Sequence, residues 1–275
     1  MILKLAISPC PNDTFMFDAL VNKRIDGGGL QFETNYQDIE ELNGLVAMQI
    51  PDVSKISVAA YPAISEFYQI LDAGAAMGNS NGPILVSKKP YTIDQINDLS
   101  IAIPGIRTTA NLLLNIAFPN AQKKEEVLFS KIEELVLQEK YDAGLIIHES
   151  RFTFQSKGLY KIVDLGEYWE QSYKMPIALG CIVVRRSLPD QIKDLINRKI
   201  AESVKYAFDY KEQSKPYIKC YSQELADEVI EQHIALYVNK YSVSLGDTGR
   251  DAIEFLFEKS NLPNRIMDKR NIFLV

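Results

Sequence analysis

The stretch that most constrains the fold is a short apolar run, residues 143–147, which ends abruptly in the polar segment 148–151. Such a run is typical of a buried parallel strand. Because the carboxyl ends of strands in an open α/β sheet face the crevice that holds ligands, we expect His148 to point into a ligand site. A neutral imidazole accepts a proton near pH 7, so His148 is a candidate general base. A histidine that only closes the strand by hydrogen bonding is the alternative.

Length and composition describe an ordinary globular chain. The 275 residues suggest one large or two modest domains, and 47% hydrophobic with 24% charged residues is a usual balance. The net charge of −6 argues against a nucleic-acid-binding surface. The three cysteines lie far apart without a C-x-x-C pair, which favours neither a disulfide framework nor a zinc cluster and suits a reducing compartment.

No segment predicts a membrane or secretory function. The longest apolar runs fall short of the roughly 18 residues of a membrane span. The apolar run before Cys10 is also shorter than the roughly 7–15 residues of a signal-peptide core. We therefore expect a cytoplasmic protein that has neither a membrane nor a nucleic acid as a partner.

Two strand–loop–helix units can each hold an anion at a helix N-terminus. In the first, a strand over residues 3–7 enters a loop with two prolines, and Asn12 or Asp13 caps a helix beginning near Thr14. In the second, a strand over residues 101–103 leads to Thr108 or Thr109 as the cap. Free backbone N–H groups at such helix starts attract carboxylates. Ordinary capped helices are the alternative.

Residues 54–60 alternate polar and apolar side chains like a further strand. Lys55 and Ser57 would point to one side, either as a donor pair at a ligand site or as a solvated strand face. The glycine-rich stretch 74–82 lacks a G-x-G-x-x-G motif between a strand and a helix, so it predicts no nucleotide loop. Since no metal motif is present either, the sequence predicts an activity without a cofactor.

The order of the segments predicts a discontinuous architecture. A strand over residues 84–87 leads into Lys88-Lys89-Pro90, a strand over 180–186 returns, and amphipathic helices follow. We expect an α/β fold with a large lobe of residues 1–87 and 184–275 and a small inserted lobe of residues 88–183. Each lobe would be a sheet flanked by helices, with a cleft between the lobes for a small molecule. His233 lies beside the apolar stripe of one helix, and we expect a structural role for it.

Three segments together resemble a known enzyme family. They are S-P-C-P-N-D-T-F at residues 8–15, P-G at 104–105 with T-T-A at 108–110, and G-L-I-I-H-E-S-R-F-T at residues 144–153. These blocks closely resemble the 1,4-dihydroxy-6-naphthoate synthases of the futalosine route to menaquinone. The resemblance runs nearly from end to end.

The resemblance implies a two-lobed, type II periplasmic-binding-protein-like fold used as a carbon–carbon lyase. The implied reaction converts cyclic de-hypoxanthinyl futalosine, an anionic and aromatic substrate, to 1,4-dihydroxy-6-naphthoate and dihydroxyacetone. The family's proton acceptor falls on His148. Its substrate-contacting segments fall on Lys55, Ile56 and Ser57 and on Thr109 and Ala110.

Three other readings of the chain remain. Chorismate dehydratase shares the architecture and pathway but is not expected to carry the S-P-C-P-N-D-T-F block. A solute-binding protein would share the fold, although it would normally have a signal peptide. A ligand-binding regulatory domain would normally be fused to a DNA-reading module, for which this chain has no room.

Overall fold

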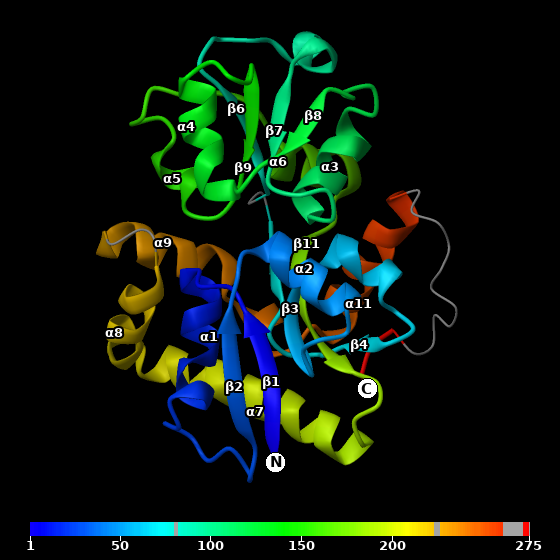
Figure 1. The fold of residues 1–275 in the computed structure, drawn as a ribbon, viewed down its shortest axis with the longest axis vertical. Helices are drawn as coiled ribbons and strands as arrows, with labels where there is room; N and C mark the ends of the chain where they lie inside the picture. The colour runs from blue at the N-terminus through cyan, green and yellow to red at the C-terminus, as the bar shows by residue number, and fades with distance from the viewer. Residues whose placement is uncertain (80–81, 223–225, 261–271, 275) are drawn as a thin grey trace. The chain divides into compact units, whose positions relative to one another are not determined.

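A computed structural model describes residues 1–79, 82–222, 226–260 and 272–274. The chain forms two compact units (Figure 1). The first comprises Met1–Met77 with Ala178–Val275, and the second is Gly78–Ile177. Each unit is a β-sheet flanked by helices, so the predicted α/β class is confirmed.

The sheet of the first unit is mixed. Its strands lie in the order β2 (Gln31–Tyr36), β1 (Ile2–Ile7), β3 (Val53–Ser57), β11 (Ile177–Arg185) and β4 (Tyr68–Ile70), and β5 (Ala76–Gly78) also pairs with β11. β1 runs parallel to β2 and β3, whereas β11 runs antiparallel to β3 and β4. The carboxyl ends of β1 and β3 therefore meet at one edge of the sheet, which places the loop after Ile7 beside Ser57.

The helical segments of the first unit include a group that packs around α1. They are α1 (Pro11–Val21), α2 (Ile39–Ala47), the 3-10 helix η1 (Val58–Ala63), α7 (Asp190–Asp209), α8 (Lys211–Tyr221), α9 (Asp227–Tyr237), α10 (Lys240–Val243) and α11 (Gly246–Lys259). α1 contacts α7, α8 and α9 (Figure 1). Phe15 of α1, Leu5 of β1 and Ile200 of α7 share one apolar core, as the periodicity of these segments predicts.

The second unit has a five-stranded sheet in the order β10 (Tyr160–Asp164), β6 (Ile84–Ser87), β9 (Ala143–Ile146), β7 (Ile101–Ile103) and β8 (Lys124–Glu126). β9 is parallel to β7 but antiparallel to β6, so the expected parallel strand has one parallel neighbour only. The carboxyl ends of β7 and β9 lie at the same edge of the sheet. The helical segments are η2 (Ile93–Asp98), α3 (Thr109–Ala117), η3 (Phe129–Lys131), α4 (Ile132–Leu137), α5 (Ser150–Thr153) and α6 (Leu165–Tyr173).

Gly144 allows one close contact in this unit. A Cβ atom at that position would collide with side chains of Ile132 and Val136. Since both belong to α4, the glycine lets this helix pack directly on β9, and Figure 1 shows α4 and α3 on opposite sides of the sheet. Among the helices that the described residues form, none combines the length and apolarity that a membrane span requires.

Two boundaries differ from the sequence-based expectation. The crossings expected near Ser87 and Val184 lie instead at 77–78 and 177–178. The reason is strand pairing, because β6 hydrogen-bonds β9 and β10 of the second sheet, and most of β11 belongs to the first sheet. Each of these strands therefore lies wholly or almost wholly inside one unit instead of marking a crossing.

The first helix also begins earlier than expected. α1 starts at Pro11 with Cys10 as its N-cap residue, whereas a start near Thr14 was expected. Proline is well suited to the first helical position, because its missing N–H has no intrahelical partner there and its fixed φ is already helical. Asn12 and Asp13 are thus inside the helix, and their side chains are available for other contacts.

Candidate functional site

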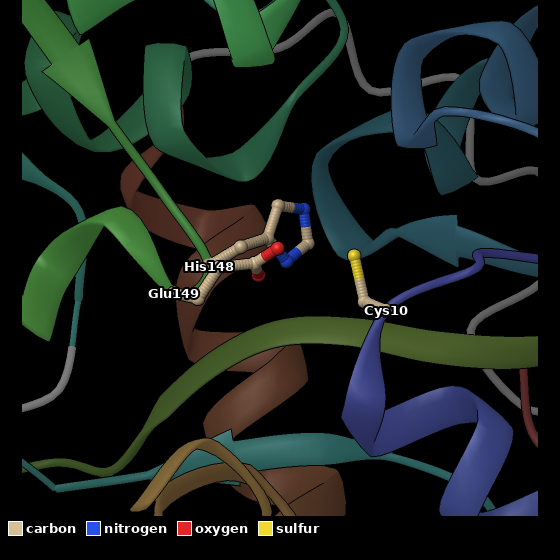
Figure 2. A group of neighbouring side chains, drawn as sticks. All are labelled: Cys10, His148 and Glu149. Carbon is tan, nitrogen blue, oxygen red and sulfur yellow. The ribbon is translucent and has the colours of Figure 1, made fainter. Parts of the chain in front are cut away.

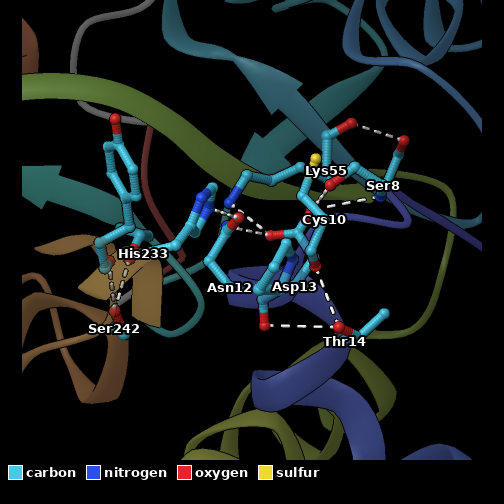
Figure 3. A network of polar contacts seen from close by, with 12 residues as sticks. Ser8, Cys10, Asn12, Asp13, Thr14, Lys55, His233 and Ser242 are labelled. Atoms are coloured by element: carbon cyan, nitrogen blue, oxygen red, sulfur yellow. Dashed lines mark hydrogen bonds and ion pairs between the residues drawn. The ribbon is translucent and has the colours of Figure 1, made fainter. Parts of the chain in front are cut away.

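In the first unit, a buried ion pair lies at the carboxyl edge of the sheet. Lys55 Nζ is 3.0 Å from Asp13 Oδ1, and the two side chains are 5% and 0% exposed (Figure 3). The other carboxylate oxygen of Asp13 accepts from the N–H of Ser8 at 3.2 Å and from its hydroxyl at 2.7 Å. Asp13 therefore ties the loop after β1 to strand β3.

Strand β3 presents Lys55 and Ser57 to this edge from a buried position. All five residues of the strand are buried, so the solvated strand face considered from the sequence is wrong. A Cβ atom at Gly180 of the neighbouring strand would lie 2.9 Å from Lys55 Cε, so glycine leaves the space that the lysine stem occupies. Next to Gly180 in the same strand, burial raises the pKa of the Cys181 thiol to about 12, and the positive charge of Lys55 opposes this rise. The Cys181 thiol is thus protonated at neutral pH.

Ser57 is held by a residue that the sequence did not identify. The Asn43 amide donates to Ser57 Oγ at 3.1 Å, and its carbonyl oxygen accepts from the Ser57 N–H at 2.9 Å. Asn43 lies in α2 and is 1% exposed. Its position in an amphipathic helix gave no signal for this contact. Ile56, between Lys55 and Ser57, is buried and pairs with Cys181 of β11.

His233 joins the same group of contacts from α9. Its Nε2 lies 2.9 Å from Asn12 Oδ1, and Asn12 Nδ2 donates to Asp13 Oδ1 at 2.8 Å (Figure 3). His233 is 0% exposed. The sequence could not reveal the link, because 221 positions separate His233 from Asn12.

In the second unit, Thr109 and Ala110 open helix α3, and its cap is one of the two residues expected. Thr108 is the N-cap, and its hydroxyl oxygen accepts from the Asn111 N–H at 3.2 Å while donating to the Gly105 carbonyl at 2.7 Å. The helix start follows β7, so its first N–H groups lie at the carboxyl edge of the sheet. A helix N-terminus at that place favours a carboxylate or another anionic oxygen.

His148 lies beyond the end of β9, after Ile147, and not within the strand. Its backbone has φ 57°, in the left-handed region that residues other than glycine rarely adopt. Such conformations persist where the surrounding structure holds them and are frequent at functional sites. His148 is partly exposed, its ring centroid is 5.0 Å from that of Phe129, and a Glu149 carboxylate oxygen lies within 4.8 Å of one of its ring nitrogens (Figure 2).

The segment after His148 is anchored on two sides. The Arg151 guanidinium donates to Asp164 Oδ2 at 2.6 Å and to the Gly82 carbonyl at 2.6 Å. On the other side, Glu133 accepts from the Ser150 hydroxyl at 2.9 Å and from Lys157 at 2.7 Å. These contacts hold the turn in which the left-handed backbone of His148 is found.

The predicted site residues thus form two groups. Lys55, Ile56 and Ser57 lie together at the carboxyl edge of the first sheet, next to the Ser8–Asp13 loop. Thr109, Ala110 and His148 follow the parallel strands β7 and β9 at the carboxyl edge of the second sheet. The sequence missed Asn43, Asp13 as the partner of Lys55, and Asp164 as the partner of Arg151.

Comparison with known proteins gives matches over nearly the whole chain. A family profile described as menaquinone biosynthesis matches residues 3–261. The 1,4-dihydroxy-6-naphthoate synthase of Thermus thermophilus is 38% identical over 258 residues, which are 94% of this chain and 93% of that protein. A crystal structure of a protein from Archaeoglobus fulgidus has a TM-score of 0.89 at 33% identity and covers 94% of this chain and 96% of its own.

More distant structures show the fold. The periplasmic aliphatic sulphonate binding protein of Escherichia coli has a TM-score of 0.65 at 11% identity, covering 99% of this chain and 92% of its own. At that identity the likeness concerns the fold alone, and it confirms the expected periplasmic-binding-protein-like architecture. The matches at higher identity go further: this chain belongs to the menaquinone-biosynthesis family of enzymes.

Proposed function

We propose that this chain is a carbon–carbon lyase that converts cyclic de-hypoxanthinyl futalosine to 1,4-dihydroxy-6-naphthoate and dihydroxyacetone, with His148 as the proton acceptor. The single observation that carries the proposal is the left-handed His148 at the carboxyl edge of the second sheet, with Glu149 within 4.8 Å. Membership of the menaquinone-biosynthesis family supports the pathway, and the name of the Thermus relative supports the product.

The proposed chemistry uses His148 as a general base. The imidazole takes a proton from the substrate, the carbon–carbon bond to the departing three-carbon fragment breaks, and the imidazolium returns the proton to the products. The naphthoate ring becomes aromatic, which makes the reaction downhill. The Glu149 carboxylate, in a residue only 9% exposed, stabilises the imidazolium that forms. The reaction as proposed needs no cofactor.

Donors in both groups of residues hold the substrate in the proposed mechanism. Thr109 and the N–H of Ala110 bind an acidic or hydroxyl oxygen at the start of α3. Lys55 and Ser57, with the backbone of Ile56, bind another polar part of the same molecule. The Lys55 ammonium has three N–H donors, and within the described residues Asp13 is its sole ionic partner, so donors are left for a ligand.

The test is to incubate the purified protein, without added cofactor, with cyclic de-hypoxanthinyl futalosine and to follow products by chromatography and mass spectrometry. We expect the naphthoate and the three-carbon fragment to appear, and chorismate offered in parallel to stay unchanged. His148→Ala should lower the turnover about 10²–10⁴-fold, the usual effect of removing a general base. Tyr160→Ala, which changes an exposed side chain of the same unit, serves as the control.

Two results would reject parts of the proposal. If a folded His148→Ala protein kept more than about a tenth of the turnover, the histidine would not be the base. If the compound bound but stayed intact, the lyase activity would be rejected and a binding function favoured. A cytoplasmic location remains a prediction of the sequence, and so does the absence of nucleic-acid and membrane partners.

A further inference from the structure

A fully buried histidine lies outside the proposed chemistry but is connected to the substrate-binding lysine. His233, in α9, reaches Asn12 at 2.9 Å; Asn12 reaches Asp13 at 2.8 Å; and Asp13 reaches Lys55 at 3.0 Å (Figure 3). Every member of this chain of contacts is at most 5% exposed. A buried polar chain of this kind is stable only when each donor meets an acceptor.

That requirement fixes the direction of each contact. An ionised carboxylate only accepts hydrogen bonds, so the atom of Asn12 that faces Asp13 must be its NH₂ group. The carbonyl oxygen of Asn12 then faces His233. Because that oxygen only accepts, Nε2 of His233 must carry the hydrogen.

The four contacts of Asp13 explain why this direction matters. Its Oδ1 meets Asn12 and Lys55, and its Oδ2 meets the N–H and the hydroxyl of Ser8. If the Asn12 amide turned over, its oxygen would face a carboxylate oxygen, and the repulsion would rotate Asp13 away. Lys55 would then lose the partner that aims its ammonium.

We propose that His233 is a positioning residue: its Nε2–H fixes the Asn12 amide, which orients Asp13 and thereby the Lys55 ammonium for substrate binding. The inference rests on the proposed function insofar as Lys55 binds substrate. His233 touches no reacting atom in this proposal. Its effect therefore belongs to binding, and loss of the contact raises KM more than it lowers kcat.

A packing role is the alternative explanation. The His233 ring lies 4.8 Å from the Tyr237 ring at 54°, a contact that an apolar side chain of similar size would largely preserve. Two substitutions separate the explanations. His233→Leu keeps the volume and removes the donor, whereas His233→Gln keeps an N–H donor close to the position of Nε2.

Steady-state kinetics with cyclic de-hypoxanthinyl futalosine provide the first measurement. We expect His233→Leu to raise KM about tenfold, the equivalent of one lost hydrogen bond, with kcat within about threefold of wild type. His233→Gln should restore most of the KM. Ser242→Ala is the matched control, because this buried hydroxyl donates to the Ala75 carbonyl at 2.8 Å and has no contact with Asn12; it should lower the melting temperature and leave KM unchanged.

Nitrogen-15 NMR of the histidine rings is the second measurement and needs no activity. The chain has two histidines, so the His233→Gln protein assigns the signals directly. We expect a proton on Nε2 of His233 in the wild-type protein at neutral pH. If wild type leaves the substrate intact, the proposed function fails, and the NMR result alone decides whether the contacts run in the stated direction.

The inference is overturned by any of three results. An unprotonated Nε2 on His233 would reverse the direction of the contacts. A wild-type KM in a folded His233→Leu protein would show that His233 serves only to pack the interior. An equal rise of KM in His233→Leu and His233→Gln would show that the donor is irrelevant. Should His233→Leu fail to fold, the NMR result and the KM of His233→Gln still decide.

Discussion

The two units place different kinds of residue at the carboxyl edges of their sheets. At the first edge, Lys55 and Asp13 form an ion pair that is almost entirely buried, and each Asp13 oxygen has two contacts. At the second edge, His148 is partly exposed and its backbone is left-handed. One edge holds a buried ion pair, whereas the other holds an imidazole in a rare backbone conformation.

In the proposed function, the first edge only binds substrate, whereas the second edge also carries the proton acceptor. Charges that are already paired and oriented need no rearrangement when a substrate arrives, which suits a binding surface. A residue in a sparsely populated backbone conformation needs support from its neighbours, and Arg151 and Ser150 anchor the segment that follows His148. Substitutions at each edge should therefore affect different quantities.

The largest effect is expected from breaking the buried pair. Lys55→Met leaves the Asp13 carboxylate without its counter-charge in a site with no exposure. Removing one member of a buried ion pair typically costs about 3–5 kcal/mol of stability. Urea unfolding, followed by a probe in the first unit, should show a loss of that size.

Lys193→Met is the matched control for this substitution. Lys193 is also buried, but its carboxylate partner Asp190 is 87% exposed and stays hydrated when the lysine is removed. Lys193→Met should therefore lower the free energy of unfolding clearly less than Lys55→Met does, although the hydrogen bond from Lys193 to Gln69 is lost as well. Equal losses would contradict the idea that the uncompensated Asp13 charge dominates.

An intermediate effect is expected at the second edge. Arg151→Gln removes a charged partner of Asp164, whose other oxygen still accepts from the N–H groups of Gly166 and Glu167. A hydrogen bond to a charged group is worth about 1.5–3 kcal/mol. The turn that carries His148 should also loosen. Because a small displacement of a catalytic group lowers the rate, we expect kcat to fall about tenfold or more.

Lys161→Gln tests whether that effect is specific. Lys161 lies in the same part of the second unit, and its 3.5 Å contact with Glu167 is solvent-exposed. Stopped assays of product formation should give wild-type kcat for Lys161→Gln. A kcat for Arg151→Gln equal to that of this control would show that the Arg151 contacts do not position His148.

Most strands and helices of the fold could be predicted from the sequence, because each produces a local periodicity of apolar residues. The strands over 3–7, 84–87 and 101–103, and the long helix after Pro189, were each visible as apolar patterns. Helix α8 was missed, since Pro216 lies inside it and proline usually ends a helical pattern. Boundaries between the units were misplaced because strand pairing is a long-range property that local patterns do not contain.

Only the site residues that belong to a contiguous sequence motif could be predicted. His148, Lys55 and Thr109 were found from strand ends and from resemblance, and their roles remain proposals. The partners were not found, because Asn43, Asp164 and His233 belong to other secondary-structure elements, 14, 13 and 221 positions from the residues they contact. The left-handed backbone at His148 also gave no sign in the sequence, since histidine adopts this conformation more often than most residues but still only in a small minority of cases.

The smallest effect is expected from an exposed ion pair, which completes the contrast with the Lys55–Asp13 pair. Hydrogen bonds from Lys89 and then Lys88 lower the pKa of Glu139 to about 2 from its ordinary 4.5. Since the folded-state pKa lies below the unfolded one, this stabilisation is present above about pH 4.5 and is lost as the pH falls towards 2. Glu139→Gln should therefore lower the melting temperature barely measurably at pH 7, because exposed pairs contribute little. Thermal melts of both proteins should converge by about pH 2, and a difference that grows as the pH falls would contradict the assigned sign.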